Sequence, residues 1–166
     1  LTSPAGNTNA ALYLPMDNAG VFDKTAHQNL ELVGNTTIRT FPFDSASVLV
    51  FDGNDTLSIP QSALSSRTSF TFEGWFYSTV SSVGSDASAD TIFSIWDNQS
   101  GEKVIMLRNQ GNNFDVIISG DGNANAYYPA SKGANTVISP FTWSHYAIRR
   151  DSGTLSICFN GIRIDR

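Results

Sequence analysis

Hydrophobic residues in this chain come in short runs in which apolar and polar positions alternate. The runs are rich in β-branched and aromatic residues, and clusters of Gly, Asn, Asp, Ser and Pro separate them. No stretch repeats its apolar positions with the spacing of a helix. Short runs with turns every eight to twelve residues or so are typical of an antiparallel sandwich or barrel. The expected strands are 11–16, 30–33, 36–39, 47–51, 56–59, 69–79, 91–96, 103–108, 113–119, 124–128, 142–150, 154–159 and 162–164.

Turn sequences predict how these strands are joined. Gly34-Asn35 lies between two runs and suits a two-residue hairpin turn. Residues 52–55 read Asp-Gly-Asn-Asp and form a second turn, while 151–153 and Asn160-Gly161 mark two more near the end of the chain. We expect each turn to join its flanking runs into an antiparallel pair.

Length and composition fit one β-domain. The 166 residues are 40% hydrophobic and include 11 Phe, which is enough for a single core. The polar loop 81–90 is too short to link two domains, so we expect one domain over 1–166. The chain begins with Leu1 rather than Met, so we expect it to be processed or part of a longer chain.

Alternation in the run 69–79 assigns its side chains to two faces. Phe70, Phe72, Gly74 and Phe76 share one face, which we assign to the core. The run 142–150 divides in the same way if its Tyr and Ile face the core. The residues on the opposite faces of the two runs are Glu73, Trp75, Tyr77, Trp143, His145 and Arg149.

A face of this composition is typical of a platform for sugars. Aromatic rings stack on the apolar faces of sugars, and carboxylate, guanidinium and imidazole groups form hydrogen bonds with hydroxyls. We therefore treat these six residues as a candidate ligand-binding face. The alternative is that they form an outer layer of the sandwich covered by loops.

The charge, the hydropathy and the cysteine content of the chain exclude several kinds of partner and bond. The net charge is −5, and the nearest approach to a basic stripe is Arg149-Arg150, so we expect no nucleic-acid partner. No run of about eighteen apolar residues exists, so we expect no membrane insertion. The single cysteine, Cys158, excludes an intrachain disulfide and a cysteine metal cluster. We interpret it as a buried or half-buried strand residue.

Several segments, in order, resemble the laminin-G-like jelly rolls. They are 51–60 (FDGNDTLSIP), 70–77 (FTFEGWFY) and 143–161 (WSHYAIRRDSGTLSICFNG), and 12–17 (LYLPMD) resembles the first strand of that family. The resemblance spans nearly the whole chain. It implies an all-β, two-sheet antiparallel β-sandwich, a concanavalin A-like jelly roll. The C-terminal closing strand of the family is missing before Arg166, and Gly74 stands where a bulky residue is usual.

The resemblance also bears on metal binding and catalysis. Related jelly rolls often hold Ca²⁺ with Asp side chains and carbonyls, and Asp17 is the matching position. Asp52 and Asp55 lie in a turn, where Asp stabilises the backbone without a metal. Related glucanases carry Glu-x-Asp-x-x-Glu on one strand, but no second acid follows Glu73 on its strand, so we expect no enzyme.

Two functions stay open. The first is a non-catalytic module for carbohydrate or cell-surface recognition in an extracellular or virion surface protein, with a glycan or surface polymer as partner. The second is a structural domain, a decoration or fibre of a phage particle or surface filament. It would join neighbouring protein subunits through edge strands, because a missing closing strand exposes an edge. A calcium-dependent protein-binding domain, as in the laminin modules, is a third reading.

Overall fold

The structure is a computed structural model that describes residues 12–16, 21, 23–25, 28–41, 47–59, 69–79, 90–95, 105–119, 126–128 and 134–165. Contacts within the chain divide it into two compact units, Leu1–Ser66 and Arg67–Arg166. We call these the smaller and the larger unit and describe each by itself. The expectation of a single domain over 1–166 stays a prediction.

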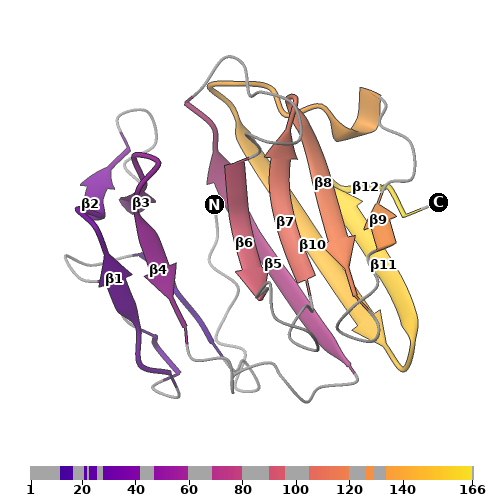
Figure 1. The fold of residues 1–166 in the computed structure, drawn as a ribbon, viewed down its shortest axis with the longest axis horizontal. Helices are drawn as coiled ribbons and strands as arrows, with labels where there is room; N and C mark the ends of the chain where they lie inside the picture. The colour runs from indigo at the N-terminus through magenta and orange to yellow at the C-terminus, as the bar shows by residue number, and fades with distance from the viewer. Residues whose placement is uncertain are drawn as a thin grey trace. The chain divides into compact units, whose positions relative to one another are not determined.

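The larger unit contains two four-stranded antiparallel sheets (Figure 1). The first has the order β12-β11-β10-β5, and its strands are β5 (Phe70–Tyr77), β10 (Trp143–Asp151), β11 (Thr154–Phe159) and β12 (Ile162–Arg163). The second has the order β6-β7-β8-β9, and its strands are β6 (Asp90–Ile95), β7 (Ile105–Gln110), β8 (Asn113–Ile118) and β9 (Ala126–Tyr128). Within the described ranges, the only helical segment is the short 3-10 turn η3 (Ala134–Thr136). The predicted all-β sandwich is confirmed.

The core of the larger unit lies between these two sheets. The Phe72 and Phe93 ring centroids are 3.9 Å apart, and Phe114 stacks on Phe159 with centroids 4.8 Å apart. Each of these pairs joins one sheet to the other, so the inner faces interdigitate as in other aligned sandwiches. The buried members of the core are Ile105, Leu107, Phe114, Val116, Ile138, Tyr146, Ile148, Ile157, Phe159 and Ile164. The inner faces predicted for β5 and β10 are therefore confirmed.

Gly74 makes room for the ring of Tyr146. The two residues are register partners on β5 and β10. A Cβ atom on Gly74 would lie 2.6 Å from the Tyr146 hydroxyl oxygen and 2.9 Å from Cζ. Tyr146 is only 7% exposed, and burial raises the pKa of its hydroxyl. The departure from the family at Gly74 is thus explained by a large neighbour on the next strand.

Hairpins join most of the strands in the larger unit. β10 pairs with β11 and β11 with β12, as the turns at 151–153 and Asn160-Gly161 predicted. Asn160 and Gly161 have φ values of 48° and 78°, the left-handed pair that a type I′ turn requires. β7 and β8 are joined in the same way by Gly111-Asn112, a turn that sequence analysis did not single out.

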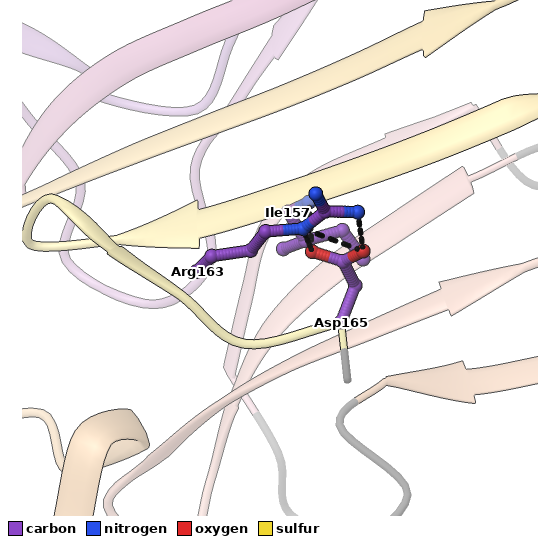
Figure 2. Close-up of polar contacts among 3 residues, drawn as sticks. All are labelled: Ile157, Arg163 and Asp165. Atoms are coloured by element: carbon purple, nitrogen blue, oxygen red, sulfur yellow. Dashed lines mark hydrogen bonds and ion pairs between the residues drawn. The ribbon is translucent and has the colours of Figure 1, made fainter.

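Asp165 continues the hydrogen bonding of β11 beyond β12 (Figure 2). The Ile164 N–H donates to the Ile157 carbonyl at 2.8 Å, and the Ile157 N–H donates to Asp165 Oδ1 at 2.9 Å. Arg163 Nη2 lies 2.7 Å from Asp165 Oδ2, and this contact lowers the pKa of Asp165. Both backbone groups of Ile157 therefore have partners, and charged side chains flank this part of the edge.

The smaller unit contains two short two-stranded sheets. β1 (Glu31–Val33) pairs with β4 (Thr56–Ser58), and β2 (Thr37–Thr40) pairs with β3 (Ser47–Val50). The hairpins predicted at Gly34-Asn35 and at residues 52–55 are both wrong, because β1 does not pair with β2 and β3 does not pair with β4. Residues 34–36 instead lead from β1 into β2, and both strands pair with the segment that returns through β3 and β4.

Side chains bridge the break between these two short sheets. The Asn35 N–H donates to Asp55 Oδ1 at 2.8 Å, and the Asp52 N–H donates to Asp55 Oδ2 at 3.0 Å. The Asn35 side-chain amide donates to Asp52 Oδ2 at 3.1 Å. Gly34 has a φ of 89°, and a Cβ there would overlap Asp55 Oδ1. The two aspartates therefore hold backbone geometry, as expected for acids in a turn.

Asp23 organises the start of the described chain. The strand predicted over 11–16 is wrong for its described residues, 12–16, none of which lies in a strand. The Tyr13 N–H donates instead to Asp23 Oδ1 at 2.9 Å, and Asp23 also accepts hydrogen bonds from Thr25 and Gln28. Burial raises the pKa of the Asp23 carboxyl, but these hydrogen bonds outweigh it and lower the pKa to about 2.

Candidate functional site

The six predicted ligand residues lie on one face of β5 and β10, opposite the core. Trp143 pairs with Tyr77 in the register, and His145 pairs with Trp75. Glu73 pairs with Ala147 in the next row on the same face. We call the outward side of β5, β10 and β11 the candidate face. The structure places the six residues together on it, and their role in binding stays a prediction.

One half of the candidate face is aromatic. The Trp75 and His145 ring centroids are 4.8 Å apart with a tilt of 52°, and Tyr77 meets Trp143 edge-on with centroids 5.5 Å apart. The Trp75 side of the first pair is the more open, because Trp75 is 51% exposed. We call these four residues the aromatic half. Edge-on and tilted contacts hold the rings in defined orientations.

The turn after β11 supports the aromatic half. The His145 N–H donates to Asn160 Oδ1, and the Asn160 N–H donates to the His145 carbonyl, each at 2.8 Å. This reciprocal pair extends the ladder between β10 and β11 by one step. These two hydrogen bonds fix the backbone of His145, and this fixes the position from which its ring reaches Trp75.

The other half of the candidate face is polar. Arg149 Nη2 lies 2.8 Å from Asp151 Oδ2, and the two side chains are 66% and 55% exposed. With Thr154 and Ser156 they line a shallow, open depression. The register explains the grouping, because Arg149 pairs with Ser156 and Asp151 pairs with Thr154. We call these four residues the polar half.

Arg149 is the only member of the polar half among the six predicted ligand residues. In the sequence, Asp151 belongs to the turn at 151–153, and Thr154 and Ser156 lie in the strand expected over 154–159. A signal was nevertheless present. The tight turn at Ser152-Gly153 sets the register of the two strands, and alternation from it puts Ser156 beside Arg149.

Small side chains separate the two halves. Ala147 stands between His145 and Arg149 on the outward side of β10, and its partners are Glu73 on β5 and Cys158 on β11. Cys158 is half-buried in its strand, as interpreted from the sequence. Neither register partner of this row supplies a second carboxylate beside Glu73.

A further exposed aromatic lies at the end of the sheet near Tyr77. Phe141 is 59% exposed, and its N–H donates to the Ser78 carbonyl at 2.9 Å. Its φ of 58° is unusual for a bulky residue and costs roughly 1–3 kcal/mol. No signal in the sequence marks Phe141, because its position in a turn has no strand alternation.

The described residues hold no group of three or more His, Cys, Asp or Glu arranged to bind a metal. Asp17, the residue suggested for Ca²⁺, lies outside the described residues, so a calcium site stays a prediction. None of the helical segments described is long and apolar enough to cross a membrane.

Comparison with known proteins supports the resemblance. A family model described as the concanavalin A-like lectin/glucanases superfamily matches residues 51–166, which is more than half of the chain. Searches of curated proteins and of solved structures found no match. The matched region contains β5, β10 and β11, the strands that form the candidate face. The chain therefore belongs to the concanavalin A-like lectin/glucanase superfamily, as its laminin-G-like segments predicted.

Proposed function

We propose that this domain is a non-catalytic binding module that recognises carbohydrate through the candidate face. The observation that carries the proposal is the exposed ring of Trp75, held against His145 on a sheet face that also carries polar side chains. An exposed indole next to hydrogen-bonding groups matches the two-sided chemistry of a sugar, which has apolar ring faces and polar edges.

The carboxylates of the candidate face support binding rather than glycoside hydrolysis. Hydrolysis requires two carboxyl groups about 5–10 Å apart on either side of the scissile bond. Glu73 has Ala147 as its cross-strand neighbour, and Asp151 is paired with Arg149.

The proposal includes a location and a partner class. We place the domain on an extracellular, cell-surface or virion protein, where it takes part in adhesion by holding a glycan or surface polymer. A chain with 15 acidic and 10 basic residues favours neither nucleic acid nor an anionic membrane as its partner.

Substitution of Trp75 tests the proposal directly. We expect wild-type protein to bind at least one polysaccharide on a glycan array, and Trp75→Ala to weaken that binding about tenfold in titration calorimetry, equivalent to about 1.4 kcal/mol. Phe51→Ala is a matched control, because Phe51 is 49% exposed but lies outside the candidate face. Wild-type protein that binds no glycan, or Trp75→Ala that binds like wild type, rejects the proposal.

A second candidate function is assembly with neighbouring subunits. The exposed apolar residues of the smaller unit favour it, since Leu32, Val33 and Phe51 are each 44–49% exposed. The charged pair Arg163–Asp165 argues against the pairing of a neighbouring subunit with β12, because charged side chains protect an edge strand from such pairing. Native mass spectrometry tests this function. A stable oligomer that Leu32→Ser dissociates supports it, and a wild-type monomer at high concentration rejects it.

A further inference from the structure

We infer that the ligand of the candidate face is an extended chain of neutral sugars, and that the polar half is a second subsite on that chain. The inference rests on the proposed function and adds the length and chemistry of the ligand. It follows from the spacing of the two halves, the groups that the polar half presents, and the shape of the row between them.

The two halves are too far apart for one sugar ring. His145 and Arg149 are four residues apart on β10, and a strand rises about 3.3 Å per residue. The Cα atoms of His145 and Arg149 are therefore about 13 Å apart along the strand. The Arg149 guanidinium is held at Asp151, two residues farther along the strand, away from His145. A ligand that touches both halves must contain several linked units that run along the strand direction.

The polar half presents a donor and an acceptor side by side. The Arg149 guanidinium has N–H groups beyond the one directed at Asp151, and the Asp151 carboxylate retains acceptor capacity. Two adjacent hydroxyls of one sugar ring can accept from Arg149 and donate to Asp151 at the same time. The hydroxyls of Thr154 and Ser156 add to the same depression.

The same ion pair selects against charged sugars. Asp151 lies 2.8 Å from Arg149, so a sulfate, phosphate or uronate that approached the guanidinium would also meet a carboxylate. A neutral diol gains both hydrogen bonds without that repulsion. Ser69 supports this arrangement, because its hydroxyl lies 3.5 Å from Asp151 Oδ1 and accepts from the Ser152 N–H at 3.2 Å.

The row between the halves leaves a path for the chain. Ala147 is the smallest outward residue on β10, and Cys158 beside it is half-buried. Glu73 flanks the path on β5 and can accept hydrogen bonds from passing hydroxyls. The face is thus lined by aromatic rings at one end, small side chains in the middle and paired charges at the other end.

A length series of neutral oligosaccharides tests the inference. Titration calorimetry would use gluco-, manno- and xylo-oligosaccharides from monosaccharide to hexasaccharide. For the series that binds, we expect affinity to rise at least tenfold between the disaccharide and the hexasaccharide. Arg149→Met is expected to remove that gain, and Thr154→Val to reduce it, because both act only on the second subsite.

Controls separate this inference from the proposed function. Arg39→Met removes an exposed arginine of β2 in the smaller unit and should leave every affinity unchanged. Equal affinity for the disaccharide and the hexasaccharide overturns the extended ligand, and so does an Arg149→Met variant that weakens all lengths equally. Binding of a monosaccharide alone leaves the proposed function intact and rejects the inference. If the wild-type protein binds none of these oligosaccharides, both the inference and the proposed function are rejected for neutral glycans.

Discussion

The outward faces of the two sheets of the larger unit have similar alternation and opposite environments. On β5 and β10, outward residues such as Trp75 and Arg149 are exposed. On β7 and β8, outward Gln110, Asp115 and Ile117 are 7%, 2% and 4% exposed. An outward position in a strand therefore does not by itself mean access to solvent. Among these residues, only those on β5 and β10 are open to a ligand.

Each face carries an Arg–Asp pair, and the two pairs differ in exposure. Arg108 Nε lies 2.6 Å from Asp115 Oδ2, with side chains 14% and 3% exposed, whereas the Arg149 and Asp151 side chains are 66% and 55% exposed. A buried pair has no solvent to replace a lost partner. An exposed pair is largely compensated by water and remains available to a third group. The buried Arg–Asp pair therefore stabilises the fold, whereas the exposed Arg–Asp pair is available for binding.

Removal of the buried cation should have the largest effect on stability. We expect Arg108→Met to lower the free energy of unfolding by about 3–5 kcal/mol, because Asp115 is left as an unpaired buried charge. Arg149→Met should lower it by no more than about 1 kcal/mol. Urea unfolding measures both. Adding Asp115→Leu to Arg108→Met should recover much of the loss, and equal effects of the two arginine substitutions would contradict the comparison.

The core side of β5 and β10 is tightly packed, whereas the candidate face on their other side is open. We expect Gly74→Ala to lower the free energy of unfolding by about 1–3 kcal/mol, because the new Cβ meets the rigid ring of Tyr146. The effects of Gly74→Ala and Tyr146→Leu should be coupled, so that the double variant loses less stability than the sum of the losses in the two single variants. Strictly additive losses in urea unfolding would show that the ring does not constrain Gly74.

Asp23 extends the comparison of carboxylates to the smaller unit. Its folded-state pKa is about 2 against an ordinary 3.8, so its hydrogen bonds stabilise the fold at pH values above the ordinary pKa. That stability is lost as the pH falls from about 4 through 2, and we expect a loss of about 1–2 kcal/mol. Asp23→Asn should weaken this acid sensitivity in urea unfolding at pH 6 and pH 2.5, without abolishing it. Asp165, whose pKa is also lowered, remains. An unchanged pH dependence in Asp23→Asn would show that Asp23 does not contribute.

The features of the fold that could be predicted from the sequence are those that depend on neighbouring residues. Alternation separated Phe72 from Trp75 on β5 because successive side chains of a strand point to opposite faces. The turn at Asn160-Gly161 was predictable because its left-handed backbone suits those two residues. The same reasoning failed at Gly34-Asn35, where a turn sequence leads from one strand to the next instead of reversing the chain.

Alternation, turn residues and motifs in the chain were sufficient to predict the strands of the larger unit, the two sides of β5 and β10, and the family to which the chain belongs. The folded structure was needed to show that Tyr146 occupies the space over Gly74, that Ser156 lies beside Arg149, and that Asp115 is buried while Asp151 is exposed. Strand alternation follows from the geometry of neighbouring peptide units. Burial and cross-strand contacts depend on segments that are distant in the chain, and no local pattern records them.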